Sequence, residues 1–200
     1  MVTKIVAKNA PPIELREMVS DVILDLVLQV PSSREGEMTH AHERAHALGR
    51  TASRQASLLA GSMALPPGVL GWLTIPLELV GVWRLQAQMV SDIAAVYGKS
   101  ATLSREQMVY CLFKHVSAQL FRDVVVRVGE RYVVQRASMA FIQSAAQTLG
   151  VKITQTIVGK GATRLVPLIG AIGVSAYAYF DTTQVAKTAI ELFSRDIVLE

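Results

Sequence analysis

Apolar residues recur at helical spacing through most of the chain, and this pattern predicts a helical protein. Between about Pro12 and Val30, apolar side chains return every three or four residues, which is the period of an α-helix. Pro12 suits the first turn of this helix, and Pro31 ends it. The polar strip of the helix is narrow, so we expect other helices to pack on both sides of it.

The next two helices are separated by a stretch that contains no charged side chain. Ser32 and Ser33 are good N-cap residues and predict a helix that reaches about Ala60. Prolines and glycines interrupt the uncharged stretch from Gln55 to Leu77. A membrane span would rarely contain so many helix breakers, so we expect a buried helix-turn-helix corner. From Thr74 the pattern predicts a long helix to Tyr97, followed by a C-terminal glycine.

The middle of the chain combines one clear helix start with one ambiguous segment. Ser104 and Gln107 have the spacing of a capping box, which predicts a helix through Leu120 or beyond. The segment from Phe121 to Arg136 is rich in valine, and Gly129-Glu130 could form a hairpin turn between two strands. Its charged residues are nevertheless spaced as neighbours on a helix. We therefore predict a helix here.

The last third predicts two further helical regions. A helix rich in small residues should run from Ala137 to Val158, before the break at Gly159-Lys160-Gly161. Leu165 to Phe180 is a second uncharged stretch, which is shorter than a typical membrane span. An amphipathic helix is expected from about Thr182 to Ser194. The predicted architecture is a compact all-α bundle of six to eight helices.

Composition places this bundle among small intracellular domains. The 200 residues are 51% hydrophobic and 18% charged, and this length suffices for one domain with its own core. A single cysteine, Cys111, cannot form an intramolecular disulfide, which indicates either a reducing compartment or a fold that is indifferent to redox conditions. Lys4 and Lys8 are not followed by an apolar run, so we expect no secretory signal. We therefore expect a cytoplasmic location.

The positive charge of the chain favours anionic partners. The formal net charge is +4. Arg44, Arg50 and Arg54 lie among few acids and are candidates for contact with anionic lipid head groups. A dense basic patch with interleaved aromatic residues is missing from the sequence, so we do not expect nucleic acid as a partner.

One short motif offers metal chemistry. His42-Glu43-Arg44-Ala45-His46 matches H-E-x-x-H, in which two histidines one helical turn apart hold Zn²⁺ and Glu43 acts as general base. A catalytic site needs a third protein ligand. The expected position is Ala52, so Glu78 or Glu106 would have to replace it. The alternative is that these residues form an ordinary solvated helix face, without a cofactor.

Two segments resemble a known family. The first runs from Gly68-Val-Leu-Gly71 through Thr74-Ile-Pro76-Leu-Glu78 to Ser91-Asp-Ile-Ala-Ala-Val-Tyr97-Gly98. The second runs from Val166-Pro167-Leu-Ile-Gly170-Ala through Asp181-Thr-Thr to Val185-Ala-Lys-Thr-Ala189 and Phe193. Together they resemble the EcsC family of bacterial helical proteins. The resemblance covers about Ala60 to Phe193, implies a compact helical fold and membrane association, and carries over no catalytic residue.

These observations predict one EcsC-like domain across residues 1–200, with an N-terminal helical pair in residues 1–60. The predicted function is non-catalytic association with the inner membrane surface or with lipid, as an accessory or interaction subunit of a transport or secretion assembly. A protein partner or a second copy of the chain is also compatible. The alternative function is a zinc-dependent metallopeptidase. The predicted lipid or partner contacts are Trp72, Trp83, Leu168, Ile169, Ile172, Tyr177 and Tyr179.

Overall fold

The computed structural model describes residues 13–63, 70–122, 124–128, 131–160 and 167–199. Within these ranges the elements are α2 (Ile13–Leu28), α3 (Ala41–Met63), α4 (Leu70–Val96), η2 (Ser100–Thr102), α5 (Arg105–Phe113), η3 (Ala118–Phe121), β1 (Val125–Val128), β2 (Arg131–Val134), α6 (Met139–Lys160), α7 (Pro167–Phe193) and β3 (Asp196–Leu199). The protein is therefore mostly helical, as predicted. The small sheet corrects the prediction that it is all-α.

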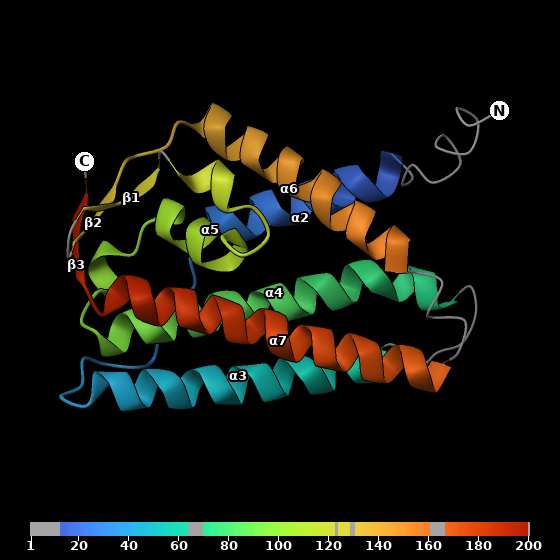
Figure 1. The fold of residues 1–200 in the computed structure, drawn as a ribbon, viewed down its shortest axis with the longest axis horizontal. Helices are drawn as coiled ribbons and strands as arrows, with labels where there is room; N and C mark the ends of the chain where they lie inside the picture. The colour runs from blue at the N-terminus through green and yellow to red at the C-terminus, as the bar shows by residue number, and fades with distance from the viewer. Residues whose placement is uncertain (1–12, 64–69, 123, 129–130, 161–166, 200) are drawn as a thin grey trace.

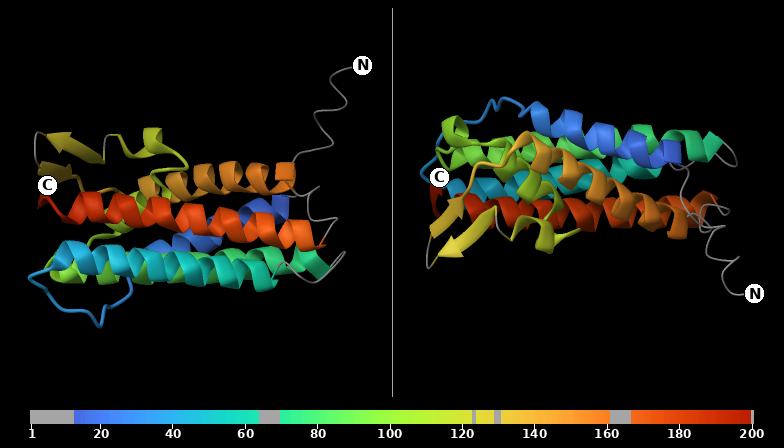
Figure 2. Two further views of the ribbon diagram at one scale, coloured as in Figure 1. Left: turned by 60° about the horizontal axis from the view of Figure 1, so that its bottom comes forward. Right: turned by 90° about the horizontal axis from the view of Figure 1, so that it is seen from above.

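The long helices α3, α4 and α7 lie side by side along the molecule (Figure 1). Helix α3 packs closely against α7, and α2 packs mainly against α6 (Figure 2). Gly49 faces Ala186, and the Ser53 and Thr183 hydroxyl oxygens are 3.1 Å apart. Because the residue numbers increase along α3 while they decrease along α7, these two helices are antiparallel. Helices α2 and α3 thus have different main partners.

Gly49 shows why α3 and α7 approach so closely. A Cβ atom at this position would lie 2.9 Å from the Cβ of Ala186, nearer than two carbon atoms can pack. The buried positions of α3 around it are also small, including Ala45, Ala52 and Ala56. Small residues on one helix let the backbone of the next come near, so the alanine-rich sequence of α3 fits its place beside α7.

The core consists of a large hydrophobic cluster and a smaller separate one, which contains Ala56, Ala60, Val82 and Ala178. The large cluster includes residues from α2, α3, α4, α5, the sheet, α6 and α7. Its largest fully buried side chains include Ile23, Ile93, Phe113, Leu149 and Phe193. The ring of Trp83 meets that of Phe113 edge to face, with 5.6 Å between centroids.

The predicted helix across Phe121 to Arg136 is wrong, because this valine-rich segment contains two strands. Strands β1 and β2 pair antiparallel, and β2 pairs in parallel with β3, which follows α7. In β2, Arg131 is exposed and Val133 half-buried, while Tyr132 and Val134 are buried, which is the two-residue period of a strand. Residues 129–130, the proposed turn, lie outside the described residues. The third strand comes from a distant part of the sequence, so local charge spacing could not reveal it.

Two local predictions about helix ends are confirmed. Gly98 follows α4 with a positive φ of 70°, and its N–H donates to the Ala95 carbonyl at 2.9 Å. The Lys99 N–H donates to the Ala94 carbonyl at 2.8 Å, which completes a Schellman motif. The capping box at the start of α5 is also present. However, α5 ends at Phe113, well before the predicted end.

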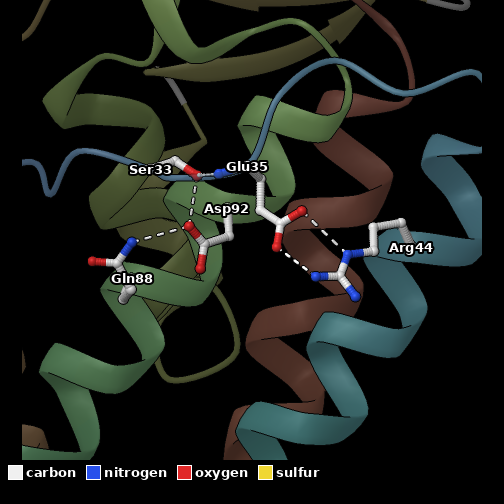
Figure 3. A network of polar contacts seen from close by, with 5 residues as sticks. All are labelled: Ser33, Glu35, Arg44, Gln88 and Asp92. Atoms are coloured by element: carbon white, nitrogen blue, oxygen red, sulfur yellow. Dashed lines mark hydrogen bonds and ion pairs between the residues drawn. The ribbon is translucent and has the colours of Figure 1, made fainter.

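The predicted start of α3 at Ser32 or Ser33 is wrong, because the helix begins at Ala41. The Ser33 hydroxyl instead donates to the Asp92 carboxylate at 2.6 Å and accepts the Glu35 N–H at 3.0 Å. Gln88 donates to the same Asp92 oxygen within α4 (Figure 3) and to the Ser32 carbonyl oxygen at 3.1 Å, so Gln88 and Asp92 both tie the connection before α3 to α4. Beside them Glu35 forms an ion pair with Arg44 of α3. These contacts stabilise an extended connection that an N-cap pattern alone does not predict.

The uncharged stretch that ends at Phe180 and the amphipathic helix expected from about Thr182 belong to one helix. Helix α7 continues from Pro167 to Phe193 through Asp181. The acidic residue does not end the helix, because its carboxylate is bound by side chains from α4 and from the segment after α5.

Candidate functional site

The first half of α7 exposes large apolar side chains. Ile172 is 63% exposed, Tyr177 52% and Phe180 67%, and Tyr179 is exposed as well. The rings of Tyr179 and Phe180 meet edge to face, with centroids 5.9 Å apart. We call Ile172, Tyr177, Tyr179 and Phe180 the α7 apolar face. Exposed apolar side chains are ordinary when scattered singly, whereas a group on one helix marks a contact surface.

Helix α3 adds both apolar and basic side chains beside this face. Because α3 and α7 are antiparallel and meet at Ser53 and Thr183, the C-terminal part of α3 accompanies the first half of α7. Leu58, in that part of α3, is 74% exposed. Arg50 and Arg54 are exposed on the same helix. In this register the two arginines lie opposite the start of the second half of α7, so positive charge borders the α7 apolar face.

The predicted contact residues differ in their exposure. Ile172, Tyr177 and Tyr179 are exposed as expected, and Phe180 and Leu58 are exposed residues that the sequence prediction missed. Trp83 is only 6% exposed and packs in the core, so its prediction as a contact residue is wrong. The side chains of the other three predicted contacts, Trp72, Leu168 and Ile169, lie outside the described part of the structure.

The three predicted head-group arginines also differ from one another. Arg44 donates two hydrogen bonds to the Glu35 carboxylate, so its charge already has a partner. The same contact holds the pKa of Glu35 below its usual value, chiefly through the hydrogen bond. Arg50 and Arg54, further along α3, are exposed. Only these last two remain candidates for an anionic partner.

The H-E-x-x-H motif occupies the first turns of α3, and its two histidines meet. Nε2 of His42 lies 3.2 Å from Nε2 of His46, and the ring centroids are 4.6 Å apart. The Tyr97 hydroxyl lies 3.1 Å from Nδ1 of His42. Partial burial, then the charges of His42 and Arg50, lower the pKa of His46. Both histidines are exposed, as is Glu43.

The described residues supply two metal ligands, one fewer than a peptidase requires. Ala52, at the third motif position, is buried in the core. The Glu106 carboxylate accepts the Ala137 N–H at 3.1 Å, away from α3, and the side chain of Glu78 is outside the described structure. No cluster of three or more His, Cys, Asp or Glu side chains suited to a metal occurs among the described residues. His42, Glu43, His46, Arg50 and Arg54 all share the exposed side of α3, as the solvated-face alternative predicts.

A polar cluster around Asp181 was missed by sequence reasoning. One Asp181 oxygen lies 2.7 Å from Nε2 of His115, and the other accepts from the Gln86 amide at 2.7 Å. Gln86 is nearly inaccessible and also donates to Thr182 at 3.0 Å. The available signal was an acid that follows an apolar stretch. Cys111, one turn before His115, is buried, and burial raises the pKa of its thiol, so it is unsuited to nucleophilic chemistry.

Open grooves also flank α2. The groove between α2 and α4 has a volume of about 630 Å³, and the one between α2 and α6 about 730 Å³. The first is lined by Asp21, Val22, Asp25, Leu26, Gln29, Val30, Pro31, Val80, Arg84, Ala87 and Gln88. Its acids and its arginine lie around an apolar floor, without the paired bases or nucleophiles that a reaction would need. The α7 apolar face is therefore the stronger candidate site.

Comparison with known protein families, with curated proteins and with solved structures finds no match to this chain. No helix in the described residues combines the length and the apolarity needed to cross a bilayer.

Proposed function

We propose that this chain is a non-catalytic, EcsC-like helical protein that binds a membrane surface through the α7 apolar face. In this role it would serve as an accessory subunit of a transport or secretion assembly. The observation that carries the proposal is the joint exposure of Ile172, Tyr177, Tyr179 and Phe180 on one helix. We expect this part of α7 to lie in the plane of the bilayer interface, with its exposed apolar side chains among the acyl chains.

The apolar side chains would supply most of the binding free energy. Full burial of a side chain such as Ile or Phe contributes about 1.5–3 kcal/mol. Ile172 and Phe180 are the most exposed of the four, so they have the most area to remove from water. The tyrosines suit the interface, because their rings are apolar and their hydroxyl groups stay near water. Leu58 of α3 would add to the same contact.

Basic residues of α3 would direct the protein to anionic lipid. Each Lys or Arg near an anionic leaflet contributes about 1 kcal/mol. Arg50 and Arg54 are exposed on the helix beside α7, and the chain as a whole has a net charge of +4. Arg44 is excluded from this set by its ion pair with Glu35. We therefore expect tighter binding to anionic than to zwitterionic vesicles.

Vesicle flotation tests the proposal. The protein should float with vesicles of phosphatidylcholine and phosphatidylglycerol, and less with phosphatidylcholine alone. The triple variant Ile172→Ser, Tyr177→Ser, Phe180→Ser should stay with the soluble fraction. The matched control is Val128→Ser with Met139→Ser, since these two apolar residues are also exposed but lie on β1 and α6. The control should float as the wild type does.

Two results would contradict membrane binding. One is a wild-type protein that remains soluble with both vesicle types. The other is a dimer in light scattering that the triple variant converts to a monomer, in the absence of vesicle binding. That second result would assign the α7 apolar face to a contact between two copies of the chain.

A further inference from the structure

The two histidines of the H-E-x-x-H motif have the spacing of a metal chelate. Their Nε2 atoms are 3.2 Å apart. Two imidazole nitrogens bound to one ion at about 2.0–2.1 Å, with tetrahedral geometry, lie about 3.3 Å apart. Both side chains are exposed on α3, so they are accessible to an ion from solution.

Tyr97 fixes the ring of His42 in a suitable orientation. Its hydroxyl lies 3.1 Å from Nδ1 of His42, so Nε2 is the nitrogen that faces His46. Metal-bound histidines commonly have a hydrogen-bond partner on the second ring nitrogen, which fixes the ring and supports the ligand. Tyr97 belongs to the last turn of α4 and its C-terminal cap, so a separate helix holds this partner in place.

The charges around the pair are mixed. Arg50, one turn after His46, is close enough to lower the pKa of that histidine, and it would also repel a metal cation. Glu43, between the two histidines in sequence, is exposed and would favour a cation. The Arg44 charge is offset by Glu35. Arg50 is therefore the residue most unfavourable to metal at this position.

We propose that His42 and His46 form a two-imidazole site for a divalent transition-metal ion, with water at the remaining coordination positions. Imidazole nitrogens suit Zn²⁺, Ni²⁺ and Cu²⁺, and Cu²⁺ is bound most tightly of the three. The site is one protein ligand short of a catalytic zinc centre, so it binds metal without peptidase chemistry. It lies on α3 and does not depend on the membrane contact proposed for α7.

Calorimetric titration of the untagged protein with CuCl₂ and ZnCl₂ tests the site. We expect one ion per chain, with tighter binding of Cu²⁺. His42→Gln and His46→Gln should each weaken binding by at least about tenfold. Loss of a ligand's hydrogen-bond partner already weakens metal binding, and loss of the ligand itself weakens it more. His40→Gln is the matched control, since His40 is also exposed and precedes the helix. It should leave the affinity unchanged.

Two further variants examine the surroundings of the site. Arg50→Gln should tighten binding a few-fold, because it removes a nearby positive charge. Tyr97→Phe should weaken it by about tenfold or less, through the orientation of His42. The electron paramagnetic resonance spectrum of the Cu²⁺ complex should show two coupled imidazole nitrogens, and one in His46→Gln.

The proposal is overturned if His42→Gln and His46→Gln bind both ions as tightly as the wild type. It is also overturned if His40→Gln is the variant that loses binding, or if the wild-type protein binds neither ion. Far-ultraviolet circular dichroism of each variant shows whether the helix is intact. Because both histidines are exposed, we expect the substitutions to leave the fold unchanged.

Discussion

The two halves of α7 differ in sequence and in surroundings, because the first half is uncharged while the second contains Asp181, Lys187 and Glu191. From Pro167 to Phe180, the described large side chains are mostly exposed, and Ala178 is the buried position. From Asp181 to Phe193, nearly every apolar side chain is buried, including Val185, Ile190 and Leu192. A single continuous helix therefore changes from a core element to a surface element at Asp181.

This difference shows that polar residues allow the buried side of a helix to be predicted. In the second half, Gln184 and Lys187 mark the exposed side, so the apolar residues can be assigned to the core by elimination. The first half has no charged residue that would mark a solvent side. Its apolar surface exceeds what the neighbouring helices cover, and this excess motivates the membrane proposal.

The largest expected difference between the halves is in stability. Phe193→Ala should lower the free energy of unfolding by about 3–5 kcal/mol, because it opens a cavity at a fully buried position. Phe180→Ala removes the same atoms from an exposed position and should change the free energy of unfolding by about 0.5 kcal/mol or less. Urea denaturation of both variants measures the contrast. Equal losses would show that the first half is also packed in solution.

The junction between the halves should show an intermediate effect. Gln86→Met keeps the approximate shape of the side chain but removes the amide that donates to Asp181 and Thr182. The loss of donors to a partly buried carboxylate should cost about 1–3 kcal/mol in thermal unfolding experiments. Gln88→Met is the control, because Gln88 hydrogen-bonds Asp92 from a more accessible position. If the two variants lose the same stability, the hydrogen bonds to Asp181 contribute no more than the hydrogen bond to Asp92.

A smaller effect is expected on the binding of the protein to anionic lipid. Arg54→Gln should weaken binding to anionic vesicles by about 1 kcal/mol, which is roughly a fivefold change in the dissociation constant. Lys187→Gln removes the same charge at a position further from the α7 apolar face and should have less effect. Vesicle titrations at low and high salt measure both. If Lys187→Gln has the larger effect, the contact surface lies further toward the C-terminus.

Most of the fold could be predicted because the helices carry local signals. The capping box at Ser104 and the glycine after α4 satisfy backbone groups within a few residues, so the sequence specifies them. The sheet could not be predicted this way. Strand β2 is completed by β3, more than sixty residues later, and the pairing of Tyr132 with Ile197 has no local pattern.

The candidate site was predictable only in part, for a related reason. The apolar stretch in α7 indicated a contact surface, and Ile172, Tyr177 and Tyr179 were chosen from it. Which aromatic residue faces outward depends on the neighbouring helices, so Trp83 was assigned to the surface and Phe180 was missed. The meeting of His42 and His46 followed from helical spacing, whereas their contact with Tyr97 depends on how α3 packs against α4.

The smallest expected effect concerns pH and the second half of α7. The pKa of Glu191 lies below its ordinary value of 4.5, mainly because the Tyr132 hydroxyl donates to its carboxylate at 2.7 Å, and Lys114 is nearby. A carboxylate whose pKa is lowered by folding stabilises the protein above its ordinary pKa, and this contribution is lost as the pH falls through the lowered value. Tyr132→Phe should therefore reduce the melting temperature more at about pH 6 than at about pH 3. Tyr179→Phe makes the same change in the first half and should show no such dependence. If the difference in melting temperature between wild type and Tyr132→Phe is the same at both pH values, this hydrogen bond does not stabilise the charged form of Glu191.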